Sequence, residues 1–132
     1  MAAIPANYLD LLQQKKAFAH LATIMPDGTP QVTPVWFDYT NGKIRVKSAK
    51  GRVKVRNMQE GAPVALSILD PDDPYRYIQI RGRVKRVTEE GARAHIDALS
   101  NKYIGKDYPW AQPGQVRITF EIEPTAAQTH DG

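Results

Sequence analysis

The sequence predicts a single, mainly β domain: an antiparallel β-barrel with inserted helices. Its 132 residues match the usual size of one domain. About six strand-like segments follow one another, mostly through tight turns. These segments do not alternate with helices in the β-α-β order of a doubly wound sheet, which favours an antiparallel barrel or sandwich. Of these two architectures, we expect the small barrel.

The first part of the chain predicts one helix and two paired strands. Residues 5–16 group apolar side chains on one broad face and end with lysines, which suits the helix dipole. Residues 18–24 and 31–39 contain the β-branched and aromatic side chains typical of strands. Pro-Asp-Gly at residues 26–28 is a strong turn signal between them, so the two strands are expected to form a hairpin.

A second hairpin is predicted at residues 41–42, because Asn-Gly accepts the positive φ of a type I′ turn. Residues 43–48 then alternate between apolar and cationic side chains, which predicts a strand with an inward and an outward face. The side chains expected to point outward are those of Lys43, Arg45 and Lys47. Residues 51–58 are ambiguous: they alternate like a strand, yet the preceding glycine and the residues that follow also allow a short helix.

Two further strands are predicted at residues 63–69 and 75–87. The acidic sequence DPDDP at residues 70–74 joins them, and its two prolines favour a rigid surface turn over a metal site.

A helix at residues 89–103 opens with two acids and carries apolar side chains on one face. A loop that contains Trp110 leads to a last strand at residues 116–123. The tail, about residues 125–132, is expected to be flexible.

The sequence lacks the residues that several classes of chemistry require. The chain has no cysteine, which excludes disulfides, thiolate metal sites and thiol nucleophiles. It contains none of the common nucleotide-binding loops, metal-hydrolase motifs or nucleophile elbows. His20 and His95 stand alone and are interpreted as packing or surface residues. Without a signal-peptide pattern or a long apolar run, a soluble cytoplasmic protein with no membrane or metal partner is expected.

Positive charge is concentrated in two acid-free windows. Residues 41–59, the first window, hold seven of the 18 Lys and Arg residues, and residues 75–88, the second window, hold five more. The first window has three interpretations: a solvated strand face, a nucleic-acid surface, or a compact phosphate cradle. It lacks the stacking aromatic side chains of single-strand binders, which disfavours nucleic acid. In the cradle, Ser48, the Gly51 amide, Arg52 and Lys54 converge on one or two phosphates.

Five motifs in order resemble the pyridoxamine-phosphate-oxidase-like split-barrel flavoproteins. They are the N-terminal helix, LATIMPDGTPQVTPVWF at 21–37, NGKIRVKS at 41–48, KGRVKVRN at 50–57 and DPDDPYRYIQIRG at 70–82. The last of these looks like the branch that uses a deazaflavin, coenzyme F420, in place of FMN. The resemblance covers roughly residues 8 to 124.

This resemblance implies an antiparallel split β-barrel that forms a homodimer with two cofactor sites at the subunit interface. Three groups of residues correspond to the cofactor site. The phosphate would rest on Lys47, Ser48, Gly51, Arg52 and Lys54. The ring would lie along Gln31, Val32, Thr33, Pro34, Val35 and Trp36. The strand with Tyr75, Arg76 and Tyr77, together with the loop of Trp110, would close the pocket, from the partner chain.

The implied function is hydride transfer from the reduced deazaflavin to an unsaturated organic substrate, such as a quinone, an enone or a tetrapyrrole. The ring performs this chemistry, so no protein base is required. Tyr75, Tyr77 or solvent are candidates for a proton donor, while Trp36, Tyr77 and Trp110 are equally compatible with interface packing. The alternatives are an FMN-binding oxidoreductase of the same fold, a cofactor-binding protein without turnover, or a nucleic-acid-binding barrel.

Overall fold

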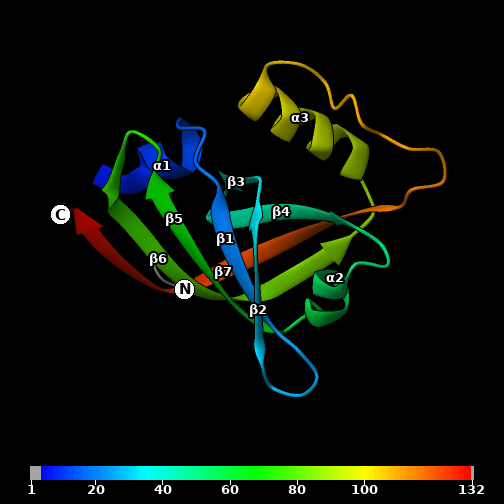
Figure 1. The fold of residues 1–132 in the computed structure, drawn as a ribbon, viewed down its shortest axis with the longest axis horizontal. Helices are drawn as coiled ribbons and strands as arrows, with labels where there is room; N and C mark the ends of the chain where they lie inside the picture. The colour runs from blue at the N-terminus through cyan, green and yellow to red at the C-terminus, as the bar shows by residue number, and fades with distance from the viewer. Residues whose placement is uncertain (1–3, 132) are drawn as a thin grey trace.

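The computed structural model describes residues 4–131 and shows one curled, antiparallel sheet (Figure 1). The strand order in this seven-stranded sheet is β2-β1-β5-β6-β7-β4-β3. The strands are β1 (Ala19–Ile24), β2 (Pro30–Val35), β3 (Phe37–Thr40), β4 (Lys43–Ala49), β5 (Pro63–Asp70), β6 (Asp73–Thr88) and β7 (Arg117–Asp131). The helices are η1 (Ala6–Tyr8), α1 (Leu9–Gln13), α2 (Val53–Asn57) and α3 (Ala92–Ile104). The predicted mainly β, antiparallel split-barrel class is confirmed.

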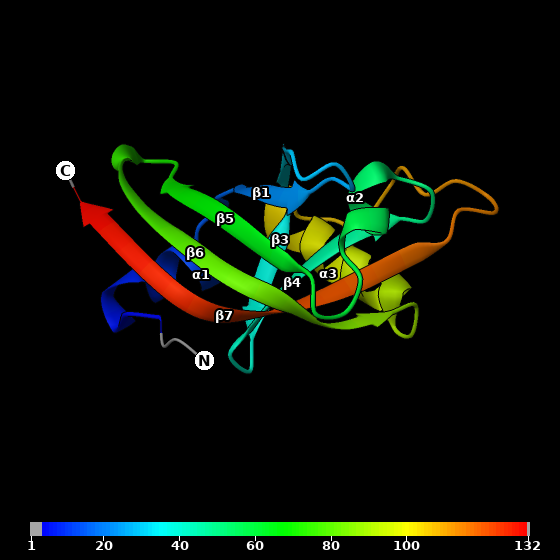
Figure 2. The same cartoon turned by 90° about the horizontal axis from the view of Figure 1, so that it is seen from below.

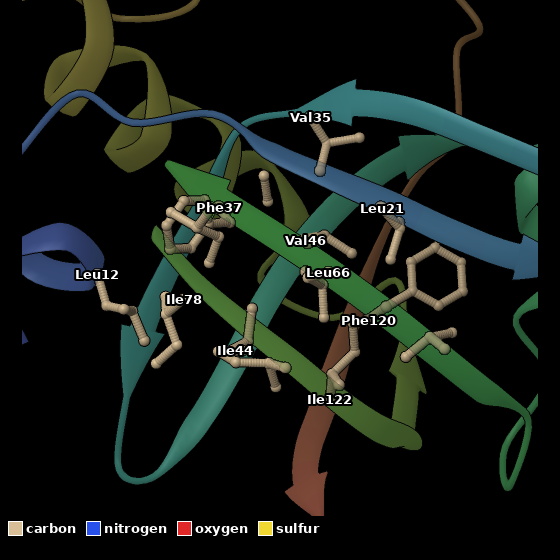
Figure 3. Close-up of a cluster of buried hydrophobic side chains, with 14 of the residues drawn as sticks. Leu12, Leu21, Val35, Phe37, Ile44, Val46, Leu66, Ile78, Phe120 and Ile122 are labelled. Carbon is tan, nitrogen blue, oxygen red and sulfur yellow. The ribbon is translucent and has the colours of Figure 1, made fainter. Parts of the chain in front are cut away.

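The core lies inside the curl of the sheet, where alternate residues of the strands point inward and are buried (Figure 3). Figure 2 shows β5, β6 and β7 bending together around this interior. The aromatic rings of Phe37 and Phe120 are fully buried there, together with the side chains of Leu66 and Ile78. The alternation predicted for residues 43–48 puts Ile44 and Val46 into the same cluster. At about 25 cal/mol per Å² of buried apolar surface, this cluster supplies most of the favourable free energy of folding.

The predicted strand at 31–39 is two strands, because the chain changes partners at Trp36. Before this residue β2 pairs with β1, and after it β3 pairs with β4 at the opposite edge of the sheet. Trp36 itself stacks on Tyr103 of α3, with ring centroids 5.2 Å apart. The period-two pattern continues through the break, so it could not reveal this change.

The structure resolves the ambiguous segment as a short helix, α2. Gly51 precedes it with φ +99°, a backbone conformation that L side chains rarely adopt. α3 begins at Ala92, later than predicted, because Gly91 has a left-handed conformation with φ +69°, which is incompatible with a right-handed helix at that residue.

The prediction of a flexible tail is wrong for residues 125–131. They extend β7, which pairs with β6 from Arg76↔Asp131 to Thr88↔Thr119. Tyr77 stacks on His130 across this pairing, with ring centroids 5.3 Å apart. The long first half of β6 therefore gains a second hydrogen-bonded neighbour, which the polar composition of the tail did not indicate. No helix within residues 4–131 is long and apolar enough to cross a membrane.

Candidate functional site

The end of β4 lies between α2 and α3 (Figure 1). A cavity of about 350 Å³ opens there. Its walls come from the β2–β3 junction, β4, α2, α3, the loop after α3 and the start of β7. One side is cationic and the other is aromatic. Part of the first cationic window therefore lines a concave site, as a ligand-binding role requires.

The cationic side contains the core of the predicted phosphate cradle. Ser48, Arg52 and Lys54 all line the cavity. Lys54 is half-buried and its Nζ lies 3.4 Å from Thr33 Oγ1. Burial and then the nearby Arg52 lower the pKa of Lys54. Ser48 Oγ is buried and has no hydrogen-bond partner within residues 4–131, so its hydrogen-bonding capacity is unused beside the cavity.

Lys47 also lines the cavity, but it is not the outward, solvated side chain that the alternation predicted. It is only 8% exposed, because α3 covers the outer face of β4. Its ammonium donates to Thr119 Oγ1 at 2.9 Å and to the carbonyl of Ala92. Burial, and then the charges of Arg117 and Arg45, lower the pKa of Lys47 to about 8.

The aromatic side is a chain of rings that begins at the β2–β3 junction. Trp36 lies 5.2 Å from Tyr103, nearly parallel to it, and 6.4 Å from Tyr108. Tyr108 in turn lies edge-on to Trp110 at 5.6 Å, and Phe18 packs against Tyr103 at 5.5 Å. Such rings present flat apolar surface with little loss of side-chain entropy on binding. This wall suits a planar ring system.

The remaining residues predicted along the ring lie on β2 with different exposure. Pro34, Val35 and Trp36 line the cavity. Gln31 instead accepts a hydrogen bond from Thr23 Oγ1 at 3.0 Å, and Val32 is 62% exposed. The residues of β2 that precede Pro34 thus lie outside the cavity wall, although Thr33 contacts Lys54. Gly51 forms the turn between Ser48 and Arg52 and does not line the cavity.

Tyr75, Arg76 and Tyr77 are at the far end of β6 and do not reach the cavity of the same chain. Tyr75 is 75% exposed. Arg76 donates to Asp10 and Asp70 at 2.8 and 2.9 Å, so its charge is already neutralised. Any contact of these three residues with a cofactor would have to involve the cavity of a second subunit.

Sequence reasoning missed several residues of the cavity wall, because distant elements contribute them. Arg117 starts β7 and lies beside Ala49 only through the β4–β7 register. Tyr108 accepts a hydrogen bond from Arg117 Nη2 at 3.0 Å, and the guanidinium lies over its ring. The other missed wall residues are Phe18, Ala49, Ile96 and Leu99. No signal in the sequence placed Arg117 here, since it stands outside both cationic windows.

Comparison with known proteins identifies the family. The model of the pyridoxamine 5'-phosphate oxidase family matches residues 4–131. The chain belongs to this family. Among solved structures, one named F420 reductase is 34% identical, with a TM-score of 0.83, and the match covers 95% of this chain and 98% of that one. A search of the curated proteins found no match.

Two more distant structures show the same fold. A conserved hypothetical protein from Mycobacterium tuberculosis is 21% identical with a TM-score of 0.72, covering 99% of this chain and 86% of that one. An FAD and heme binding protein from Mycobacterium smegmatis is 18% identical with a TM-score of 0.69, covering 98% and 73%. The pyridoxamine 5'-phosphate oxidase fold thus occurs in proteins with differently named ligands, and the cavity of this chain must indicate its own ligand.

Proposed function

We propose that this protein is an oxidoreductase that binds coenzyme F420 and uses its reduced form to donate hydride to an unsaturated organic substrate. The observation that carries the proposal is the two-sided cavity: Arg52 and Lys54, which have no carboxylate partner within residues 4–131, lie on one side, and aromatic rings that include Trp36 lie on the other. The 34% identity to a protein named F420 reductase favours the deazaflavin over FMN. We further propose quinones, enones or tetrapyrroles as the substrate class.

The chain's own residues fit a phosphorylated cofactor. Ser48 offers a buried hydroxyl without a partner within residues 4–131, and Arg52 and Lys54 add charge at the side of the cavity formed by α2. Arginine gives bidentate contacts to phosphate, and lysine adds a mobile point charge. The excess of positive charge over what one phosphate requires favours the deazaflavin, which also carries an acidic tail.

The aromatic side would orient the ring and keep water away from it. Trp36 is held in place by stacking on Tyr103, whose hydroxyl accepts a hydrogen bond from Phe37 N at 3.3 Å. Burial raises the pKa of Tyr103, so this hydroxyl stays protonated. A fixed ring face allows substrate and cofactor to meet in one orientation, which is the protein's main contribution to hydride transfer.

We propose a cytoplasmic homodimer in which the partner completes each site. Ile24 and Val32 leave apolar surface exposed at the β2 edge of the sheet, at 43% and 62%. Tyr75, at the far end of β6, is also exposed and would contribute to the cavity of the other subunit. Burial of such surface is the usual driving force of dimer formation.

The deciding experiment is incubation of the purified apoprotein with F420 and, separately, with FMN, followed by gel filtration and absorbance and fluorescence spectra of the protein peak. We expect F420 to co-elute with a dimer, and its reduced form to be oxidised on addition of menadione or cyclohexenone. Retention of FMN alone would replace the proposal with the FMN-binding alternative. Retention of F420 without any oxidation would indicate a binding protein without turnover.

A further inference from the structure

A polar cluster is buried between α3 and the outer face of the sheet, where apolar packing is the usual arrangement. Lys47, Thr119 and Asp38 contribute to it from β4, β7 and β3, and His95 contributes from α3. Lys47 and Thr119 are direct partners in the β4–β7 register. Lys47, Thr119 and His95 are 8%, 4% and 5% exposed. A cluster of this kind is costly to bury, so its residues have a role beyond packing.

The four side chains form a continuous line of hydrogen bonds. Lys47 Nζ donates to Thr119 Oγ1 at 2.9 Å, and Thr119 Oγ1 lies 3.1 Å from His95 Nδ1. On its other side, His95 Nε2 lies 3.2 Å from Asp38 Oδ2. Either ring nitrogen of histidine can carry the proton, so the line can conduct a proton in one direction and then reset.

The line joins the cavity to the surface. At one end Lys47 lines the cavity. At the other end the Asp38 carboxylate accepts hydrogen bonds from both Nε and Nη2 of Arg45, at 2.8 and 2.7 Å. The Arg45 and Asp38 side chains are 31% and 19% exposed, so bulk water reaches this pair. The cavity therefore has a polar route to solvent that is separate from its open mouth.

The charges around Lys47 leave its ammonium without a carboxylate partner within residues 4–131. Both of its hydrogen-bond acceptors, the Ala92 carbonyl and the Thr119 hydroxyl, are neutral. Arg117 and Arg45 repel the ammonium, and Asp38 attracts it from beyond salt-bridge distance. Burial, and then the charges of Arg117 and Arg45, bring the pKa of Lys47 to about 8, which is the range in which a lysine gives up its proton readily. Burial also lowers the pKa of His95, which favours the neutral ring.

We propose that Lys47 is the catalytic acid that protonates the substrate during its reduction, and that Thr119, His95 and Asp38 are positioning residues that return the proton from solvent. This inference rests on the proposed function. It replaces the candidates Tyr75 and Tyr77, which lie away from the cavity of their own chain. It also separates the two ends of the cavity: Arg52 and Lys54 hold the phosphate on the α2 side, while Lys47 acts on the α3 side.

The atoms and electrons balance as follows. An enone accepts hydride, with both electrons, at its β-carbon from the reduced deazaflavin, and its carbonyl oxygen becomes negative. The Lys47 N–H bond breaks and an O–H bond forms on that oxygen, which leaves a neutral amine and an enol that rearranges to the ketone. A hydronium ion of bulk water then delivers a proton, at the Asp38 side, to Nε2 of the Nδ1–H tautomer of His95, which releases its Nδ1 proton to Thr119. The Thr119 hydroxyl proton passes to Lys47 and restores the ammonium.

The first test compares Lys47→Met with Lys54→Met, using F420 and cyclohexenone as probes. Lys47→Met should keep F420 affinity within about threefold but slow turnover by roughly 100-fold or more, the usual contribution of a general acid. Lys54→Met should show the opposite pattern, weak binding with less effect on turnover at saturation. An equal loss of F420 affinity in both variants would assign Lys47 to the phosphate cradle and overturn the proposal, as would normal turnover by Lys47→Met.

The second test uses His95→Gln, which keeps a polar side chain but cannot relay a proton. In rapid mixing, the first turnover should proceed at the wild-type rate, and later turnovers should slow by roughly tenfold, because only reprotonation is affected. Equal rates in all turnovers would overturn the relay. This variant also keeps the proposal testable if Lys47→Met fails to fold.

A third measurement needs no cofactor. NMR of the Lys47 side chain in the apoprotein should show titration near the pKa of about 8, well below the usual lysine value of 10.5. Turnover of the wild type should fall as pH rises through the same value, because the acid is then deprotonated. A normal lysine titration would overturn the proposal. A wild type that binds F420 and titrates as expected, yet reduces neither cyclohexenone nor menadione, would instead overturn the proposed function.

Discussion

The two cationic windows look alike in the sequence, yet the fold places particular cations of each in opposite surroundings. In the second window, Arg76 is bound by Asp10 and Asp70. Arg86 there lies 3.4 Å from Glu121. In the first window, Arg52 and Lys54 instead face a cavity, and no carboxylate lies within salt-bridge distance of either in the part of the chain described.

The difference shows what an acid-free stretch of sequence means. Asp10 is 66 residues away from Arg76 in the chain, so the neutralising acid is invisible in any local window. Neutralised cations stabilise the fold, whereas cations that converge on a cavity repel one another until an anion binds. Only the second situation indicates a ligand.

The largest effect is expected from breaking the neutralised cluster at Asp70. The side chain of this residue is 5% exposed, and its carboxylate accepts hydrogen bonds from Lys15 Nζ and Arg76 Nη1, each at 2.9 Å. Asp70→Asn should lower the free energy of unfolding by about 3 kcal/mol, because two charged hydrogen bonds lose their acceptor charge. Urea denaturation measures this change. The matched control is Asp72→Asn: Asp72 also binds Lys15 but is 79% exposed, so a change within about 0.5 kcal/mol is expected.

Acid should break the same cluster without a mutation. Burial raises the pKa of Asp70, but the hydrogen bonds from Lys15, Asp72 N and Arg76 outweigh burial and lower it from 3.8 to about 2. A depressed folded-state pKa contributes stability above the unfolded value and loses it as pH falls. Thermal stability should therefore decline between about pH 4 and pH 2. A decline of the same size in Asp70→Asn would show that other carboxylates cause it.

The next effect sharpens the comparison on the ligand side. Lys54→Ala should weaken F420 binding roughly 10- to 150-fold, because one charged hydrogen-bond partner is worth about 1.5–3 kcal/mol. Lys85→Ala, in the second window, removes the same charge from an exposed position and should change affinity little. Fluorescence titration of both variants gives the answer. Equal losses would mean that the positive charge acts as a diffuse field, without a defined cradle.

Cofactor preference should show a smaller effect. We expect F420 to bind at least about tenfold more tightly than FMN, or about 1.4 kcal/mol, because the unpaired cations exceed what one phosphate requires. Exposed contacts to the acidic tail are screened over about 8–10 Å at physiological salt, so the preference should shrink as salt rises. Titrations at low and high ionic strength would contradict this if FMN bound as tightly throughout.

The stability of the apoprotein should respond least. Lys54→Ala removes a half-buried cation that lies beside Arg52 and whose only described polar contact is the Thr33 hydroxyl. Its melting temperature without cofactor should equal or slightly exceed that of the wild type, with a change within about 0.5 kcal/mol. A clear loss of stability would place Lys54 among the structural cations of the second window.

Nucleic acid should bind negligibly, since a cradle uses few of the cations that a long polyanion needs. We expect no binding of single-stranded DNA or RNA tighter than about 10⁻⁶ M near 0.15 M salt, where nonspecific constants are about 10⁻⁴–10⁻⁶ M. Fluorescence anisotropy measures this, and a submicromolar constant with a steep salt dependence would favour the nucleic-acid-binding barrel.

The strands and hairpins followed from local patterns. Asn41 has φ +53° and Gly42 has φ +75°, as the turn residues predicted, and Ile44 and Val46 are fully buried, as the alternation predicted. The cationic side of the cavity was also predictable in part, because Ser48, Arg52 and Lys54 lie close together in the chain. These features depend on backbone preferences and on a period of two, both of which act over a few residues.

Tertiary structure alone decided the rest. The partner change at Trp36, the pairing of residues 125–131 with β6 and the place of Arg117 in the cavity wall all depend on which strands meet. Lys47 alternates as an outward residue, yet it is buried because α3, from a distant part of the chain, covers that face. Whether a cation is solvated, neutralised or aimed at a ligand depends on groups brought close in space, since Coulomb energy follows distance between charges and not their separation in sequence.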